Sequence, residues 1–159
     1  MNSLELICPA GGLPALKAAV DNGADGVYTG FRDETNARNF NGLNFDAAQL
    51  REGVAYAKRH GARVLTALNT YPQSGNWARW TEAVDRAVDC GVDALIVADP
   101  GLMTYARQRH PSVNLHLSVQ GSASNYEAIN FYREQFGIHR AVLPRVLSLA
   151  QVEQVVANT

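Results

Sequence analysis

The 159-residue sequence has few cysteines, no long apolar run and almost no net charge. Cys8 and Cys90 are too few for a disulfide framework or a four-ligand metal site, and reduced thiols fit a cytoplasmic protein. The apolar run at residues 4–7 is too short for a signal peptide, and no stretch approaches the roughly 20 apolar residues of a membrane span. With a formal net charge of −1, the chain lacks the excess of Lys and Arg that is typical of a nucleic-acid-binding domain. The sequence therefore predicts a cytoplasmic protein with no metal held by this chain, no membrane span and no nucleic-acid partner.

Sequence motifs of several enzyme classes are missing as well. No Gly-x-Gly-x-x-Gly or Walker-type loop follows a predicted strand, which argues against the common nucleotide-binding folds. The sequence has no His-Glu-x-x-His and no local Ser/His/Asp or Cys/His arrangement, so no protease centre can be recognised.

A recurring glycine turn divides the chain into units. At Gly23, Gly61, Gly91 and Gly137 a helix-like segment ends and a β-rich apolar run follows, because glycine suits the left-handed conformation that closes a helix. The pattern predicts six helices, each preceded by a strand, at residues 14–22, 46–60, 77–90, 100–109, 124–136 and 149–157.

Helix starts are marked by capping signals. Asp99 precedes Pro100, which places a capping oxygen before a proline in the first helical turn. Capping-box spacing predicts three further starts, at Asp46 with Gln49, Ser124 with Glu127, and Ser148 with Gln151.

Strict alternation of strands and helices predicts a parallel sheet with right-handed crossovers. Short, regular units without a nucleotide-binding loop favour a barrel over an open doubly wound sheet. We therefore predict one α/β domain at residues 1–159, an incomplete (β/α) TIM-like barrel of six parallel strands and six helices. Six units do not close an eight-stranded barrel, so the first and sixth strands should be open edges through which the chain can self-associate.

Polar side chains gather in the loops after the predicted strands, where parallel α/β sheets place their sites. The loop at residues 31–45 is the longest, as binding segments and lids often are. Arg32 and Arg38 could clamp a carboxylate, with Arg145 approaching from the sixth strand. Alternatively, the loop is solvated and its arginines pair with its own Asp and Glu residues. We predict a substrate-binding set that comprises Arg38, Asn44, Asn69, Ser118, Gln120 and Arg145.

His116 and Cys8 could each be catalytic, and each also has a purely structural interpretation. Alternation along the fifth strand places Asn114, His116, Ser118 and Gln120 toward the barrel interior. His116 is either an acid/base or an internal histidine hydrogen-bonded to a neighbouring strand. Cys8 would need a nearby base to act as a nucleophile, and a small buried residue is the better interpretation. No catalytic residue is assigned.

Several of these segments resemble the collagenase-like peptidase family, family thirty-two of the peptidases of unknown type. The likeness rests on Leu-Ile-Cys-Pro-Ala-Gly at residues 6–11, Asn-Gly-Ala-Asp-Gly-Val-Tyr-Thr-Gly at 22–30 and Leu-Pro-Arg at 143–145. Within that family, the segments at residues 35–40, 42–45, 105–106, 118–120 and 127–132 look like those of the UbiU branch. The likeness covers essentially the whole chain.

The resemblance implies a role in oxygen-independent ubiquinone biosynthesis, in which UbiU-like proteins pair with a UbiV-like protein and support hydroxylation of a quinone precursor. It also implies an iron–sulfur (4Fe-4S) cluster in the full-length protein and a small carboxylate such as prephenate as oxygen source, bound by arginines such as Arg38 and Arg145. The cluster cysteines of the branch lie downstream of Thr159, so we expect the chain to stop before the cluster-binding segment, to hold no cofactor and to be inactive by itself.

Two alternatives remain. The chain could be a collagenase-like peptidase, as some members of the family are described. It could instead be a non-catalytic scaffold whose open sheet edge docks a partner barrel.

Overall fold

The structure is a computed structural model that describes residues 4–159. Its strands are β1 (Ile7–Pro9), β2 (Gly26–Gly30), β3 (Arg63–Leu68), β4 (Ala94–Val97), β5 (Asn114–Leu117) and β6 (Arg140–Ala141). Its helices are α1 (Leu13–Asp21), α2 (Ala47–Arg59), α3 (Trp77–Asp89), α4 (Pro100–Arg109), α5 (Tyr126–Phe136) and α6 (Leu149–Ala157), with a short 3₁₀ helix, η1, at Val119–Gly121. None of the described helices is long and apolar enough to cross a membrane.

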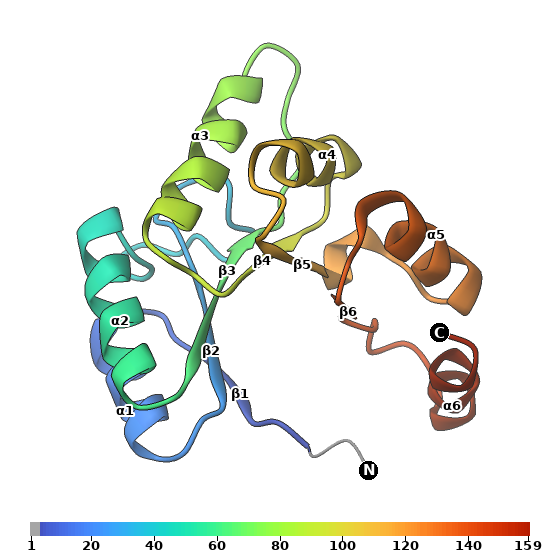
Figure 1. The fold of residues 1–159 in the computed structure, drawn as a ribbon, viewed down its shortest axis with the longest axis horizontal. Helices are drawn as coiled ribbons and strands as arrows, with labels where there is room; N and C mark the ends of the chain where they lie inside the picture. The colour runs from blue at the N-terminus through green and yellow to red at the C-terminus, as the bar shows by residue number, and fades with distance from the viewer. Residues whose placement is uncertain (1–3) are drawn as a thin grey trace.

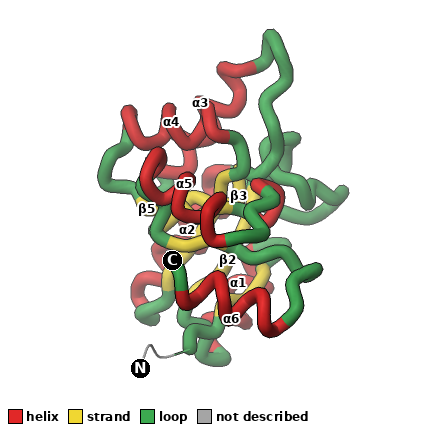
Figure 2. Tube along the Cα trace, turned by 90° about the vertical axis from the view of Figure 1, so that its right-hand side faces the viewer, coloured by secondary structure: helices red, strands yellow, loops and turns green. Residues whose placement is uncertain are grey.

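The six strands form one parallel sheet in chain order, β1-β2-β3-β4-β5-β6. Figure 1 shows the sheet curling as it runs from β1 to β6, with helices on its outer side, and Figure 2 shows the same layering from the side. The predicted incomplete barrel of six alternating units is confirmed.

Alternation along each strand separates two faces. The outward side chains of Val27, Val64, Leu95 and Leu115 are fully buried against the helix layer. The helices pack apolar side chains at helical spacing against this face of the sheet. In α3 these are Trp80, Ala83, Val84 and Ala87. The hydrophobic core therefore lies between sheet and helices, and the concave face of the sheet is left for other side chains.

Helix ends follow the predicted signals with one exception. Both reciprocal hydrogen bonds of a capping box form between Asp46 and Gln49 and between Ser148 and Gln151. Asp99 accepts a hydrogen bond from the Leu102 amide. The capping box predicted at Ser124 is wrong. The residue that caps α5 is Asn125, whose side chain accepts from the Ala128 amide at 2.8 Å. Asparagine caps as well as serine, so two adjacent candidates could not be separated by residue type.

The glycine turns are confirmed by backbone geometry. Gly23, Gly61, Gly91 and Gly137 all have φ between 63° and 89°, in the left-handed region where a side chain would be strained. Each one ends a helix and turns the chain into the next strand.

The two sheet edges, β1 and β6, are linked by charge. Glu5, just before β1, accepts a hydrogen bond from Arg140 of β6 at 2.5 Å and one from Arg63 of β3 at 2.6 Å. These ion pairs cross the N-terminal end of the curled sheet and connect residues that are 58 and 135 positions apart.

Candidate functional site

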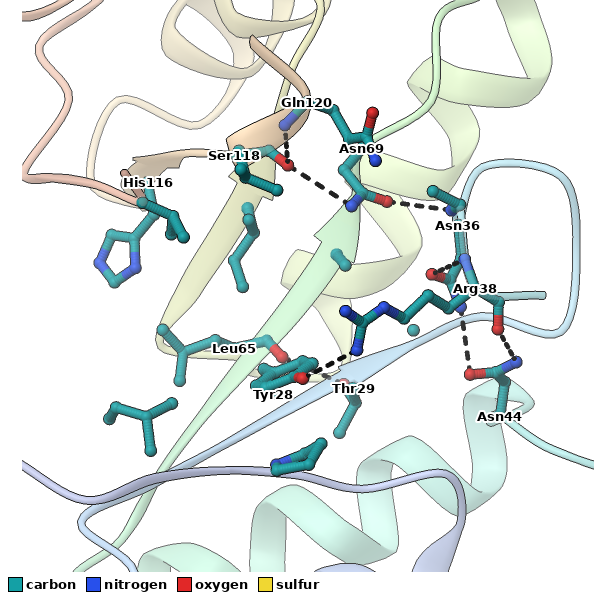
Figure 3. Close-up of a pocket in the computed structure, with 18 of the residues that line it drawn as sticks. Tyr28, Thr29, Asn36, Arg38, Asn44, Leu65, Asn69, His116, Ser118 and Gln120 are labelled. Carbon is teal, nitrogen blue, oxygen red and sulfur yellow. Dashed lines mark hydrogen bonds between the residues drawn. The ribbon is translucent and has the colours of Figure 1, made fainter. Parts of the chain in front are cut away.

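A cavity of about 760 Å³ lies on the concave side of the sheet. It is lined by five of the six residues predicted for substrate binding: Arg38, Asn44, Asn69, Ser118 and Gln120. The sixth, Arg145, does not line the cavity; it is exposed in the turn between β6 and α6, and its part in binding stays a prediction. Figure 3 shows the polar side chains converging from the ends of β2, β3 and β5.

The loop between β2 and α2 is anchored at both ends. Phe31 and Phe45 form a parallel β-bridge, and both side chains are buried. Within the loop, the buried amides of Asn36 and Asn44 face one another, with Asn36 Nδ2 donating to Asn44 Oδ1 at 3.1 Å. A long loop thereby becomes an ordered wall of the cavity.

The two asparagines hold both backbone groups of Arg38. The Arg38 amide donates to Asn36 Oδ1 at 3.0 Å, and Asn44 Nδ2 donates to the Arg38 carbonyl at 2.9 Å. The guanidinium of Arg38 then reaches over the cavity and donates to the Tyr28 hydroxyl at 3.1 Å (Figure 3). Among residues 4–159, Arg38 pairs with no carboxylate, so its charge is available to an anion.

Gly30 makes room for this arrangement. A Cβ atom at that position would lie 2.2 Å from Asn36 Nδ2. The end of β2 therefore needs glycine because the Asn36 side chain crosses directly over its backbone.

Asn69 connects the loop to the other wall. Its Oδ1 accepts from the Ala37 amide at 3.0 Å, and its Nδ2 donates to Ser118 Oγ at 3.4 Å. Ser118 Oγ also accepts from the Gln120 amide at 3.2 Å. Gln120 lies in η1 rather than in β5, so the alternation predicted for the fifth strand ends at Ser118, although Gln120 still lines the cavity.

Arg32 does not join Arg38 at the cavity. Its guanidinium donates to the carbonyls of Leu43 and Asn44 and to Gln49, and so fastens the loop to the start of α2. The predicted clamp of two loop arginines is wrong.

The pairing of loop arginines with loop carboxylates is wrong too. Asp33 pairs with Arg86 at 2.8 Å and Glu34 with Arg79 at 3.0 Å, both from α3. The loop acids thus fix the loop to the helix layer and leave Arg38 without a carboxylate partner within the described residues.

The far end of the cavity has a different character. His116 and Arg140 line it from β5 and β6, beyond an apolar stretch that includes Leu65 and Ile96. Burial, followed by the positive charge of Arg140, lowers the pKa of His116 from its ordinary value of 6.5 to about 4, so the imidazole is neutral at pH 7. Hydrogen bonds from Arg140 and Arg63 lower the pKa of the Glu5 carboxyl.

Polar lining residues absent from the predicted set include Tyr28, Asn36 and Arg140. Tyr28 and Arg140 sit on strands, where the alternation that places His116 inward would place them inward too once the register is known. Asn36 belongs to the segment at residues 35–40, and nothing in the sequence shows that its amide is buried.

The cysteines lie away from the cavity. Cys8 packs against the hydrophobic core on the face of β1 opposite to Ile7 and Pro9, and Cys90 is buried at the end of α3. Burial raises the pKa of the Cys90 thiol. Residues 4–159 contain no group of three or more His, Cys, Asp or Glu side chains that could hold a metal ion.

Comparison with known proteins gives the family. The profile described as Peptidase family U32 matches residues 11–159. The chain belongs to peptidase family U32. A structure of the U32 peptidase Mk0906 superposes with a TM-score of 0.76 at 15% identity, covering 100% of this chain and 68% of that one, and supports the fold alone.

Relatives in this family carry names of two kinds. The chain is 37% identical over 150 residues to the tRNA hydroxylation protein P1 of Bacillus subtilis strain 168, covering 94% of the chain and 35% of that protein. It is 30% identical over 155 residues to the collagenase of Porphyromonas gingivalis W83, covering 98% of the chain and 36% of that protein. The chain spans about a third of the length of the curated relatives it matches.

Proposed function

We propose that this chain is the cavity-bearing part of a UbiU-like component of oxygen-independent ubiquinone biosynthesis, which supports ring hydroxylation together with a UbiV-like partner in the cytoplasm. One observation carries the proposal: the segments that resemble the UbiU branch at residues 35–40, 42–45 and 118–120 build the cavity wall around Arg38. Relatives named for hydroxylation of RNA support the reaction class.

Charge and shape support a small carboxylate as a ligand. Arg38 is held from both sides by asparagine amides, and within the described residues no Asp or Glu lines the cavity. With its backbone fixed by these amides and its guanidinium donating to the Tyr28 hydroxyl, Arg38 binds a carboxylate without losing much side-chain freedom. Prephenate, the proposed oxygen source, carries such a group, and the quinone precursor is the proposed acceptor.

The described residues do not fit the iron–sulfur cluster that the UbiU resemblance implies. Cys8 packs against the hydrophobic core, Cys90 is buried at the end of α3, and no third cysteine is present in the chain. No step of the reaction is assigned to a cluster on these residues. The part proposed for this chain is to bind and orient the carboxylate.

The names of the relatives favour a second substrate, a tRNA base. The two candidate substrates differ in which hydroxylated product is lost when ligand binding in the cavity is impaired. In an anaerobically grown strain without its own UbiU-like gene, a gene carrying Arg38→Ala should fail to restore ubiquinone, measured by mass spectrometry, while hydroxylated tRNA nucleosides stay unchanged. Arg51→Ala, on an exposed position of α2, is the matched control and should restore ubiquinone. Loss of hydroxylated nucleosides with normal ubiquinone would favour the tRNA reading instead.

Two further assays, peptide cleavage and co-purification, separate the peptidase and the docking scaffold from the hydroxylation role. A peptidase would cleave a collagen-derived peptide in a manner abolished by one point substitution in the cavity. A docking scaffold would co-purify with a UbiV-like protein and support normal ubiquinone when Arg38 or Arg145 is replaced. Either result would set the hydroxylation role aside.

A further inference from the structure

Asn41 and Gly42 form an exposed turn in the loop between β2 and α2. The Leu43 amide donates to the Phe40 carbonyl at 3.1 Å and closes this turn, in which Gly42 has a φ of 78°. Within residues 4–159, neither the Asn41 side chain nor the Gly42 amide nitrogen takes part in a hydrogen bond. A Cβ atom placed on Gly42 would meet nothing within 4 Å, so the space around this residue is open.

The chain has a second Asn-Gly pair, Asn22-Gly23, which is also exposed but lies at the end of α1. There the Asn22 side-chain amide donates to the Ala18 carbonyl at 2.8 Å, and the Gly23 amide donates to the Val20 carbonyl at 3.1 Å. Within the part of the chain that the structure describes, the same two groups are therefore bonded in one Asn-Gly pair and free in the other.

We propose that Asn41 is a site of spontaneous deamidation, with water as the co-reactant. The Gly42 amide nitrogen loses its proton to solvent and attacks Asn41 Cγ. The bond from Cγ to the side-chain nitrogen breaks, the nitrogen takes a proton from solvent and leaves as ammonia, and a five-membered succinimide remains. Water then opens this ring at either carbonyl and gives aspartate or isoaspartate, so one water is consumed, one ammonia is released and no electron is transferred. Glycine favours the attack because it has no Cβ beside the reacting nitrogen.

Deamidation changes the segment that positions Arg38. Asn44 Nδ2 donates to the Arg38 carbonyl at 2.9 Å and closes residues 38–44 into a ring, with residue 41 at its midpoint (Figure 3). Either product adds a carboxylate that is ionised at pH 7, and isoaspartate also lengthens the backbone inside this ring. The modification should therefore weaken carboxylate binding at Arg38. This consequence, unlike the modification itself, rests on the proposed function.

Peptide mass spectrometry of the folded chain during incubation at pH 8 tests the modification. Trypsin releases Asn22 within residues 18–32 and Asn41 within residues 39–51, so separate peptides report the two sites, and fragment spectra locate the converted residue. Conversion should be about tenfold faster at Asn41, because two further hydrogen bonds must break at Asn22. In urea, where both pairs are unfolded, the two rates should become similar.

Two variants separate the modification from its consequence. Asn41→Gln, which would have to close a slower six-membered ring, should stay unconverted over the same period. Asn41→Asp carries the charge of the product without the lengthened backbone, and should bind prephenate about two- to fivefold more weakly than the unaltered chain in isothermal titrations. After incubation, the unaltered chain should lose affinity in step with its conversion, while Asn41→Gln keeps its own.

Each outcome bears on one part of the proposal. Equal conversion of Asn41 and Asn22 in the folded chain, or faster conversion of Asn22, overturns the deamidation site, as does the absence of conversion at both. Conversion of Asn41 with unchanged prephenate affinity overturns the consequence alone. If the fresh chain binds no prephenate, the carboxylate site and the consequence are overturned together, and the mass spectra still decide whether Asn41 is modified.

Discussion

At the scale of single residues, Asn36 determines whether Arg38 is positioned. Its buried amide bonds to the Arg38 backbone, the Phe31 carbonyl and Asn44. We predict that Asn36→Ala leaves these groups without partners and lowers the free energy of unfolding by about 1–3 kcal/mol. Carboxylate affinity should fall at least tenfold although Arg38 itself is intact.

Urea denaturation and titration with prephenate measure the two effects. Asn22→Ala is the matched control, because Asn22 is exposed and its amide bonds only to the Ala18 carbonyl of its own helix. If Asn36→Ala behaved like Asn22→Ala in both measurements, Arg38 would not depend on the asparagine pair.

His116 gives a prediction for pH. Its folded-state pKa of about 4 lies below its ordinary value of 6.5, so the unfolded chain binds more protons between these values. The contribution of His116 to stability is therefore complete above pH 6.5 and decreases as the pH falls toward 4. His116→Phe should flatten the free energy of unfolding over this window in urea titrations, and an unchanged slope would contradict the burial of a neutral imidazole.

Sequence reasoning reached most cavity residues from a single rule, that polar residues after parallel strands meet at one end of the sheet. This rule found Arg38, Asn69 and Ser118. It could not tell that Asn44 and Asn69 hold the loop backbone, since that depends on how the loop folds back over Gly30. The rule also assigned Arg32 to ligand binding, whereas its guanidinium fastens the loop to the start of α2.

At the scale of elements, the start of α5 distinguishes two neighbouring capping candidates. Asn125 accepts from the Ala128 amide, whereas no such bond reaches Ser124 in the described structure. We predict that Asn125→Ala costs about 1 kcal/mol of unfolding free energy and Ser124→Ala almost nothing, as measured by thermal or urea denaturation. Equal costs, or a larger cost at Ser124, would show that the capping box predicted from the sequence forms in solution.

The helices were predictable within one or two residues because their ends carry local signals: a capping side chain, a proline in the first turn, or a left-handed glycine. The bounds of α4 and α6 match the prediction at both ends. The short strand β6, of two residues, could not be bounded in this way, because its extent depends on pairing with β5.

At the scale of the whole molecule, the Glu5 ion pairs link the two sheet edges. The pKa of Glu5 is lowered in the folded state from its ordinary value of 4.5, so its stabilising effect is present above that value and is lost as the pH falls through the folded-state pKa. We predict that Glu5→Gln destabilises the chain at pH 7 and weakens the loss of stability below about pH 4.5.

Glu52→Gln is the matched control, because the exposed Lys17–Glu52 pair joins only α1 to α2. Free energies of unfolding from urea titrations between pH 3 and 7 make the comparison. Identical curves for the two variants would mean that the edges of the curled sheet are independent of Glu5.

The alternation of six units predicted the architecture, the chain order of the strands and the two open edges. The ion pairs of Glu5 could not be predicted, since their partners lie 58 and 135 residues away and meet only when the sheet curls. The division of the cavity into an Arg38 end and a His116 end likewise follows from that curl.

The central claim is that Arg38, positioned by two asparagines, makes this cavity a carboxylate site. Isothermal titration of the chain with prephenate tests it most directly, comparing the unaltered chain with Arg38→Ala and with Arg51→Ala on the outer surface of α2. The account predicts binding by the unaltered chain and the Arg51 variant, and at least a tenfold loss, about 1.4 kcal/mol, for the Arg38 variant. Equal binding by all three would contradict it.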